Sequence, residues 1–266
     1  RVRPDGAPEP LTPASALRFA DLVWDARRRR ILCVREDHTG GGEPQNSIVS
    51  VDADQGGPGV VLVAGRDFYA APRLSPEGTS LAWIEWSHPH MPWDAAELWV
   101  APVQADGRLG EAARVAGGRG ESAIQPRWSP EAVLYFVSDR TDWWNLYRLK
   151  DGRVEALTDL EAEFATPPWV FGMQQYAFAS PGRILCAFTR KGAWSLASLA
   201  VETRRLTPLQ LPYTDISSLQ CDGHQAAFLA GSPSEPLSVI RMDVESGRRE
   251  VLRRSTPLSL DPEYLS

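Results

Sequence analysis

The stretch SPEGTSLAW at residues 75–83 returns in altered form as SPEAVLYF at 129–136 and as SPGRILCAF at 180–188. The steps between the three serines are 54 residues (75 to 129) and 51 residues (129 to 180). Each copy is a polar turn followed by an apolar run. Self-similarity at a period near fifty residues indicates a repeat architecture, in which each repeat is one supersecondary unit.

Each repeat is predicted to hold four short strands. In one repeat, apolar or aromatic runs occupy 70–74, 81–86, 98–103 and 112–116, with turns rich in Gly, Pro and Asp between them. This alternation is typical of strands and turns. Similar runs lie at 30–34, 47–51, 133–137, 145–149, 154–158, 184–188, 194–199, 226–229 and 239–242.

The fold class that this pattern predicts is all-β. No window of eleven or more residues shows helical periodicity, and the nearest candidate, 161–178, is broken by Pro167 and Pro168. Four-stranded units of this length repeated around an axis are propeller blades. We therefore expect a β-propeller with about five full blades plus a partial one. Two packed β-sandwich domains are the alternative.

The repeat register also predicts domain boundaries. Residues 3–13 match residues 150–159 at Asp-Gly and at Leu-Thr, so residues 1–18 are expected to be the tail of a truncated preceding blade. Residues 255–266 break the repeat, contain Pro257 and Pro262, and are expected to be a linker to a further domain. The five blades are expected at about 19–65, 66–118, 119–164, 165–213 and 214–254.

Charge and hydropathy exclude some classes of partner. The net charge of −6 argues against nucleic acid, because phosphate binding needs clustered Lys and Arg. The one basic cluster, Arg27–Arg30, falls at a predicted turn and is interpreted as a solvated hairpin rather than a binding patch. No apolar stretch reaches eighteen residues, so no membrane span is expected.

The three cysteines do not form an even disulfide framework. Cys33 and Cys186 both follow Ile-Leu in a predicted second strand, which favours buried packing over a disulfide or a nucleophile. Reduced thiols are typical of a cytoplasmic protein, and this is the location we expect. Whether a signal peptide precedes the chain is left open.

The sequence predicts no catalytic residue, no metal site and no cofactor. It lacks the Gly-x-Ser-x-Gly turn of an α/β-hydrolase nucleophile; the nearest stretch, GESAI at 120–124, has no second Gly. His88 and His90 flank Pro89, but no third ligand stands at a metal-like spacing. His224 follows Asp-Gly in a predicted turn and is expected at the surface.

One edge of the predicted blades gathers aromatic and charged residues. Because strands alternate in direction, the loops between second and third strands emerge at the same edge as the connections between blades. Such residues suit contact with a substrate or a neighbouring domain. The predicted contact residues are His88, Trp93, Asp94, Asp139, Arg140, Trp143 and Trp144 from the inner loops, and Arg66, Tyr69, Glu161 and Glu163 from the connections.

Several of these stretches resemble a known family. HPHMPWD at 88–94, ELWV at 97–100, YFVSDR at 135–140 and WWNLY at 143–147 are similar to the propeller of acylaminoacyl-peptidases and dipeptidyl-aminopeptidases in the prolyl oligopeptidase family. EAEF at 161–164 and WVFG at 169–172 share the resemblance, which covers nearly the whole chain. The Ser-Pro turn by itself is common to many propellers.

The resemblance implies a seven-bladed propeller followed by an α/β-hydrolase domain that cleaves short peptides with a Ser-Asp-His triad. The propeller of such an enzyme excludes folded proteins and shapes the substrate chamber. This chain holds no triad, so its partners would be its own C-terminal hydrolase domain and short peptide substrates. Glu161 and Glu163 would bind the substrate amine through charge-assisted hydrogen bonds, or they are solvated loop acids.

Two other classes of function stay open at this point. One is a stand-alone interaction module resembling the TolB-type propellers, which bind proteins and have no catalysis. The other is a five-bladed glycoside-binding or glycoside-hydrolysing propeller, which needs paired carboxylates across a central funnel.

Overall fold

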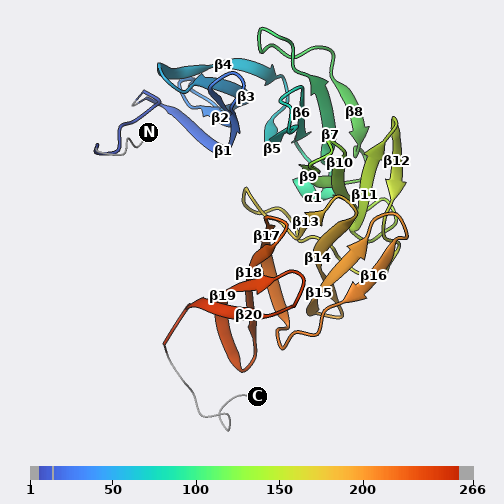
Figure 1. The fold of residues 1–266 in the computed structure, drawn as a ribbon. Coiled ribbons are helices and arrows are strands. Elements are labelled where there is room, and N and C mark those ends of the chain that lie inside the picture. The colour runs from blue at the N-terminus through green and yellow to red at the C-terminus, as the bar shows by residue number, and fades with distance from the viewer. Residues whose placement is uncertain (1–5, 14, 258–266) are drawn as a thin grey trace. The chain divides into compact units, whose positions relative to one another are not determined.

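The computed structural model describes residues 6–13 and 15–257. In that part of the chain the strands form five four-stranded antiparallel sheets, and each sheet is built from strands that follow one another in the sequence (Figure 1). The predicted all-β propeller with five full blades is confirmed. The predictions for residues 1–5 and 258–266 lie outside the described residues.

The strands have the following bounds. The first sheet holds β1 (Leu17–Asp25), β2 (Arg30–Asp37), β3 (Gln45–Asp52) and β4 (Gly56–Ala64). The second holds β5 (Phe68–Leu74), β6 (Ser80–Trp86), β7 (Glu97–Pro102) and β8 (Ala113–Ala116), with the short helix α1 (Pro92–Ala95) between β6 and β7. The third holds β9 (Ala123–Trp128), β10 (Leu134–Ser138), β11 (Asn145–Lys150) and β12 (Arg153–Ala156). The fourth holds β13 (Tyr176–Ser180), β14 (Arg183–Arg190), β15 (Ala193–Ala200) and β16 (Arg205–Pro208). The fifth holds β17 (Asp215–Cys221), β18 (Gln225–Ser232), β19 (Glu235–Asp243) and β20 (Arg249–Arg254).

The chain forms two compact units, and each is described by itself. The first unit comprises residues 1–136 together with 168–172. The second comprises residues 137–167 and 173–266. The short segment 168–172 therefore leaves its neighbours in sequence to join the first unit.

The repeated Ser-Pro stretch forms the turn between the first and second strands of a blade. The Ser75 hydroxyl accepts hydrogen bonds from the backbone N–H groups of Thr79 (3.1 Å) and Ser80 (3.0 Å). Ser129 repeats the device by accepting from Val133 N–H at 3.2 Å. In these two copies the serine thus pairs backbone donors that the turn leaves unpaired.

The first strands β1, β5 and β17 each carry a bulge with a residue in the left-handed region. These residues are Asp21, Ala71 and Ser218, with φ between 50° and 55°, and Gln125 of β9 has a φ of 53° as well. Such a conformation is uncommon outside glycine, and bulges of this kind bend a strand. The Asp21 carboxylate accepts the Ala71 N–H at 2.6 Å, so the bulge of β1 is bonded to the bulge of β5.

The central strands are buried on both faces. In the first unit, Leu32 and Val34 of β2 pack against β6, whereas Cys33 packs with Val49 and Val51 on the other face. Leu11 covers part of that second face, and its carbonyl accepts the Gly57 N–H at 3.0 Å. Two-sided burial explains why these strands read as continuous apolar runs rather than alternating ones.

All three cysteines lie in the described part of the chain and form no disulfide there, and Cys33 and Cys186 are buried, as expected. Removal from water disfavours the thiolate and raises the pKa of Cys33 to about 11. Burial raises the pKa of Cys186 as well. Both residues therefore act as small apolar side chains in the blade cores.

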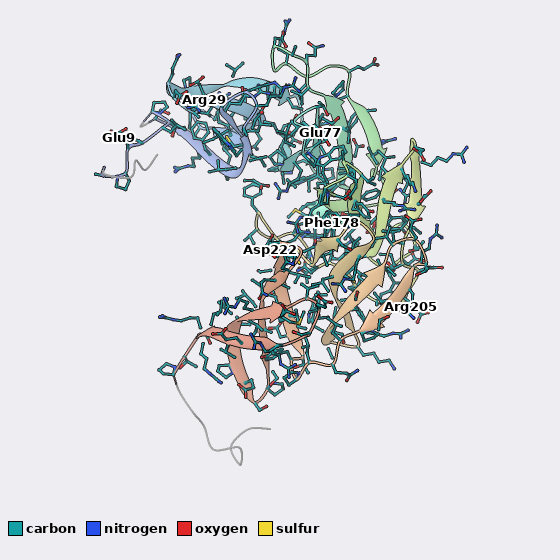
Figure 2. All side chains as sticks on the ribbon, viewed as in Figure 1. Glu9, Arg29, Glu77, Phe178, Arg205 and Asp222 are labelled. Atoms are coloured by element: carbon teal, nitrogen blue, oxygen red, sulfur yellow. The ribbon has the colours of Figure 1, made fainter. Side chains whose placement is uncertain are left out.

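The interpretation of Arg27–Arg30 as a solvated hairpin is wrong for two of its members. The side chains of Arg28 and Arg30 are only 12% and 11% exposed, and both pair with the fully buried Asp25, at 3.2 and 2.9 Å. Arg28 also donates to the carbonyls of Gly78 (2.9 Å) and Gln104 (3.0 Å), which ties the first blade to two turns of the second. Arg29, labelled in Figure 2, is exposed and pairs with the exposed Asp54.

We predict that Asp25→Ala destabilises the protein by about 3 kcal/mol, because it leaves two buried guanidinium groups without their counter-ion. Urea unfolding measures the effect. The matched control is Asp54→Ala, which removes a solvent-screened surface pair and leaves the midpoint unchanged within error. Equal midpoints for the two variants would contradict this role of Asp25.

Candidate functional site

The predicted contact residues of the first unit lie at the edge where β6 ends and β7 begins. Arg66 stands in the connection between β4 and β5, and His88, Trp93 and Asp94 stand in the β6–β7 loop. Two hydrogen bonds join this loop to that connection: Asp67 N–H donates to the Ser87 hydroxyl (3.3 Å), and His88 N–H donates to the Asp67 carboxylate (2.9 Å).

Tyr69 has a different place from the one predicted for a contact residue. It lies on β5, is buried, and packs in the core between the first two blades. Its hydroxyl accepts the Arg66 N–H at 2.8 Å. Burial raises the pKa of the Tyr69 hydroxyl, so it stays protonated at neutral pH. Tyr69 therefore holds the connection in place rather than presenting a contact surface.

Arg66 is held by two carboxylates that the sequence reasoning missed. Glu85 and Glu97 are partners across β6 and β7. The Arg66 guanidinium lies 3.1 Å from Glu85 and 3.6 Å from Glu97. The indoles of Trp83 (2.8 Å) and Trp99 (3.0 Å) donate to Glu85 and Glu97, respectively. The spacing Trp-x-Glu followed by Glu-x-Trp on paired strands is the signal that could have revealed this network.

The β6–β7 loop is ordered by its own short helix. The Met91 N–H donates to the Asp94 carboxylate at 3.0 Å, which caps α1. The Ser122 hydroxyl donates to the Pro92 carbonyl at 2.6 Å in a buried position. The loop thus presents Trp93 and Asp94 from a fixed backbone.

A pair of indole rings in contact lies at this loop, with exposed apolar residues next to each in the sequence. Residues 168–172 bring Trp169 against Trp93, with ring centroids 4.2 Å apart. Trp169 is 70% exposed and Val170 is 66% exposed, with Phe171 at 45% and Met91 at 44%. We use the name aromatic patch for Trp93 and Trp169, which are in contact, together with their exposed sequence neighbours Met91, Val170 and Phe171. Among its members only Trp93 was predicted, because Trp169–Phe171 look like an ordinary connection in the sequence.

In the second unit the remaining predicted residues surround the loop between β10 and β11. The Arg140 guanidinium lies 5.1 Å from the centre of the Tyr147 ring. Trp143 is exposed and Trp144 is buried. Asp139 is half-buried, and its carbonyl accepts the Asp142 N–H at 2.8 Å.

Glu161 and Glu163 differ in their surroundings. Glu163 is half-buried, and its carboxylate accepts the Trp144 N–H at 2.9 Å. Its backbone exchanges two hydrogen bonds with Thr189, at 3.0 and 2.9 Å. Glu161 is exposed. Glu163 is therefore fixed between the β10–β11 loop and β14, whereas Glu161 is free to meet a ligand from solvent.

The described residues hold no group of three or more His, Cys, Asp or Glu side chains placed to bind a metal ion. No helix in the described part of the chain is long and apolar enough to cross a membrane.

The fold and this edge define a class of protein: a β-propeller whose inner loops and blade connections carry aromatic and charged side chains. No Gly-x-Ser-x-Gly nucleophile turn occurs in its sequence.

Comparison with known proteins shows which solved structures this chain resembles. A puromycin-hydrolysing peptidase of Mycobacterium tuberculosis is 38% identical, with a TM-score of 0.90 over 98% of this chain. Prolyl oligopeptidase B from Galerina marginata (13% identical, TM-score 0.72) covers 95% of the chain, and TolB from Acinetobacter baumannii (14%, 0.59) covers 85%. At these last two identities the likeness shows the fold alone. No protein-family model and no curated protein matches the chain.

The resemblance to the propeller portion of prolyl oligopeptidase family peptidases is thereby confirmed. The chain spans 42% of the M. tuberculosis peptidase, 36% of prolyl oligopeptidase B and 53% of TolB. The acylaminoacyl-peptidase or dipeptidyl-aminopeptidase branch stays a prediction.

We predict that Glu85→Ala lowers the free energy of unfolding by about 2 kcal/mol, because the buried Trp83 indole loses its acceptor and Arg66 loses a counter-ion. Chemical denaturation measures the change. Glu77→Ala, in the exposed turn before β6, is the control and leaves stability unchanged (Figure 2). An unchanged free energy of unfolding in Glu85→Ala would show that this network does not stabilise the fold.

Proposed function

We propose that this chain is the non-catalytic propeller part of a serine peptidase. It gates and shapes a substrate chamber above a C-terminal α/β-hydrolase domain that cleaves short peptides and aminoacyl amides. The observation that carries the proposal is the match to the M. tuberculosis peptidase: nearly the whole chain superposes, yet it spans less than half of that enzyme. That enzyme hydrolyses puromycin, an aminoacyl amide, which supports this substrate class.

We do not propose the alternative function, a stand-alone interaction module of the TolB type. Its support is the likeness to TolB, at 14% identity and a TM-score of 0.59. The match to the M. tuberculosis peptidase, at 38% identity and a TM-score of 0.90, favours the peptidase. We also propose that the contact residues at the loop edge of each unit face the hydrolase domain or the substrate.

The proposed function is tested by comparing this chain with the longer protein encoded by the same gene. We predict that the coding sequence continues past Ser266 into a Gly-x-Ser-x-Gly turn within about 150 residues. The longer protein should hydrolyse aminoacyl-nitroanilides and lose the activity to a serine-directed inhibitor, while this chain alone hydrolyses nothing. Inhibitor-sensitive turnover by this chain, or a stop codon after Ser266, would overturn the proposal.

We further propose that Glu161 binds the substrate amine, with Glu163 holding the loop beside it. An exposed carboxylate forms a charge-assisted hydrogen bond with an ammonium group. The support is the contrast in the structure: Glu163 is engaged by Trp144, and Glu161 is exposed.

We predict that Glu161→Gln in the longer protein raises KM for free-amine peptides by about three- to tenfold and leaves kcat nearly unchanged. N-acetylated peptides, which carry no ammonium group, serve as the matched substrates and should show no change. An unchanged KM for free-amine peptides would remove Glu161 from substrate recognition.

A further inference from the structure

The aromatic patch is an exposed apolar surface built on a rigid support. Trp93 sits on α1, whose backbone is fixed by the Met91–Asp94 and Ser122–Pro92 hydrogen bonds. Trp169 packs on Trp93, and most of the Trp169 surface stays open to solvent. A preordered aromatic surface loses little conformational entropy when a ligand binds, which favours a binding role over a chance exposure.

The two segments that carry the patch contain a single charged residue. The segments that build it are residues 87–96 and 168–172, and Asp94 is the one Asp, Glu, Lys or Arg in their sequence. Asp94 is exposed and adjacent to Trp93. The patch therefore favours an apolar ligand that is neutral or carries a positive charge.

The size of the patch fits a single side chain. Its four most exposed members are one Trp, one Val, one Phe and one Met, each 44–70% exposed. A domain interface needs roughly 800 Å² from each partner, whereas one aromatic side chain buries about 150–250 Å². Four partly exposed side chains supply the smaller area and fall short of the larger one.

We propose that the aromatic patch binds the aryl side chain of a cationic aminoacyl or peptide substrate, and thereby selects aromatic substrates. The inference rests on the proposed function for its biological role, but the binding step needs only this chain. Aryl rings pack against exposed indoles in offset or tilted geometries, and Trp169 offers an open indole for that contact. Asp94 favours ligands with a free ammonium group over acidic ones.

Saturation-transfer NMR on this chain tests the proposal with three probes. Phenylalaninamide is cationic, N-acetylphenylalaninamide is neutral, and N-acetylphenylalanine is anionic. Binding should weaken in that order, and alaninamide should not bind. Trp169→Ala should weaken phenylalaninamide binding at least about threefold. Asp94→Asn should reduce the preference for the cationic over the neutral probe by about two- to fivefold.

The matched control is Trp24→Ala. Trp24 is 52% exposed on β1 and lines an apolar groove of about 550 Å³ with Leu22 and Phe19. Its removal should leave the affinity for phenylalaninamide unchanged. Affinity lost with Trp24 but kept without Trp169 would place the ligand in that groove and overturn the proposal. No saturation transfer to either amide of phenylalanine would overturn it as well.

Failure of this inference is distinguishable from failure of the proposed function. If the chain binds phenylalaninamide through Trp169 and the longer protein hydrolyses nothing, the site stands and the peptidase role falls. The alternative outcome is that the longer protein cleaves aromatic and alanyl substrates at equal rates, with no change in either rate in the Trp169→Ala variant. In that case the peptidase role stands and the aryl site is wrong.

Discussion

Burial of both faces of each blade is the constraint on which the rest of this structure depends. A four-stranded sheet with apolar residues on both sides, such as β2 with Leu32 and Cys33 pointing to different cores, is stable only when something covers each side. Repetition of the blade is the solution that this sequence encodes. Side chains such as Arg28, which reaches two turns of the neighbouring blade, then fix one blade against the next.

The same constraint leaves the blade edges as the place for function. Within a blade the faces are occupied, so the aromatic and charged side chains that can meet a partner lie in the loops and connections. In the first unit the β6–β7 loop meets the β4–β5 connection, and in the second the β10–β11 loop meets the connection after β12. Antiparallel strands bring these two kinds of loop to one edge, which is where a hydrolase domain and a substrate would contact the propeller.

The sequence predicted the central strands well, because two-sided burial produces apolar runs such as those of β6 and β14. It did not predict the first strands clearly, since a left-handed residue such as Asp21 or Ser218 interrupts their pattern. The burial of Arg28 was missed because Gly78 and Gln104, whose carbonyls it contacts, lie 50 and 76 residues away in the sequence. Trp169 was missed as a contact residue for the same reason: its packing on Trp93 joins segments 76 residues apart.

The central claim is that the loop edge of this propeller faces a hydrolase domain and its substrate. Hydrogen–deuterium exchange, measured on this chain and on the proposed longer protein, tests it most directly. The account predicts slower exchange in the longer protein at residues 87–96, 139–144 and 161–172, and equal exchange at the short turns 26–29, 76–79 and 104–108. Protection confined to the short turns, or found at neither edge, would contradict it.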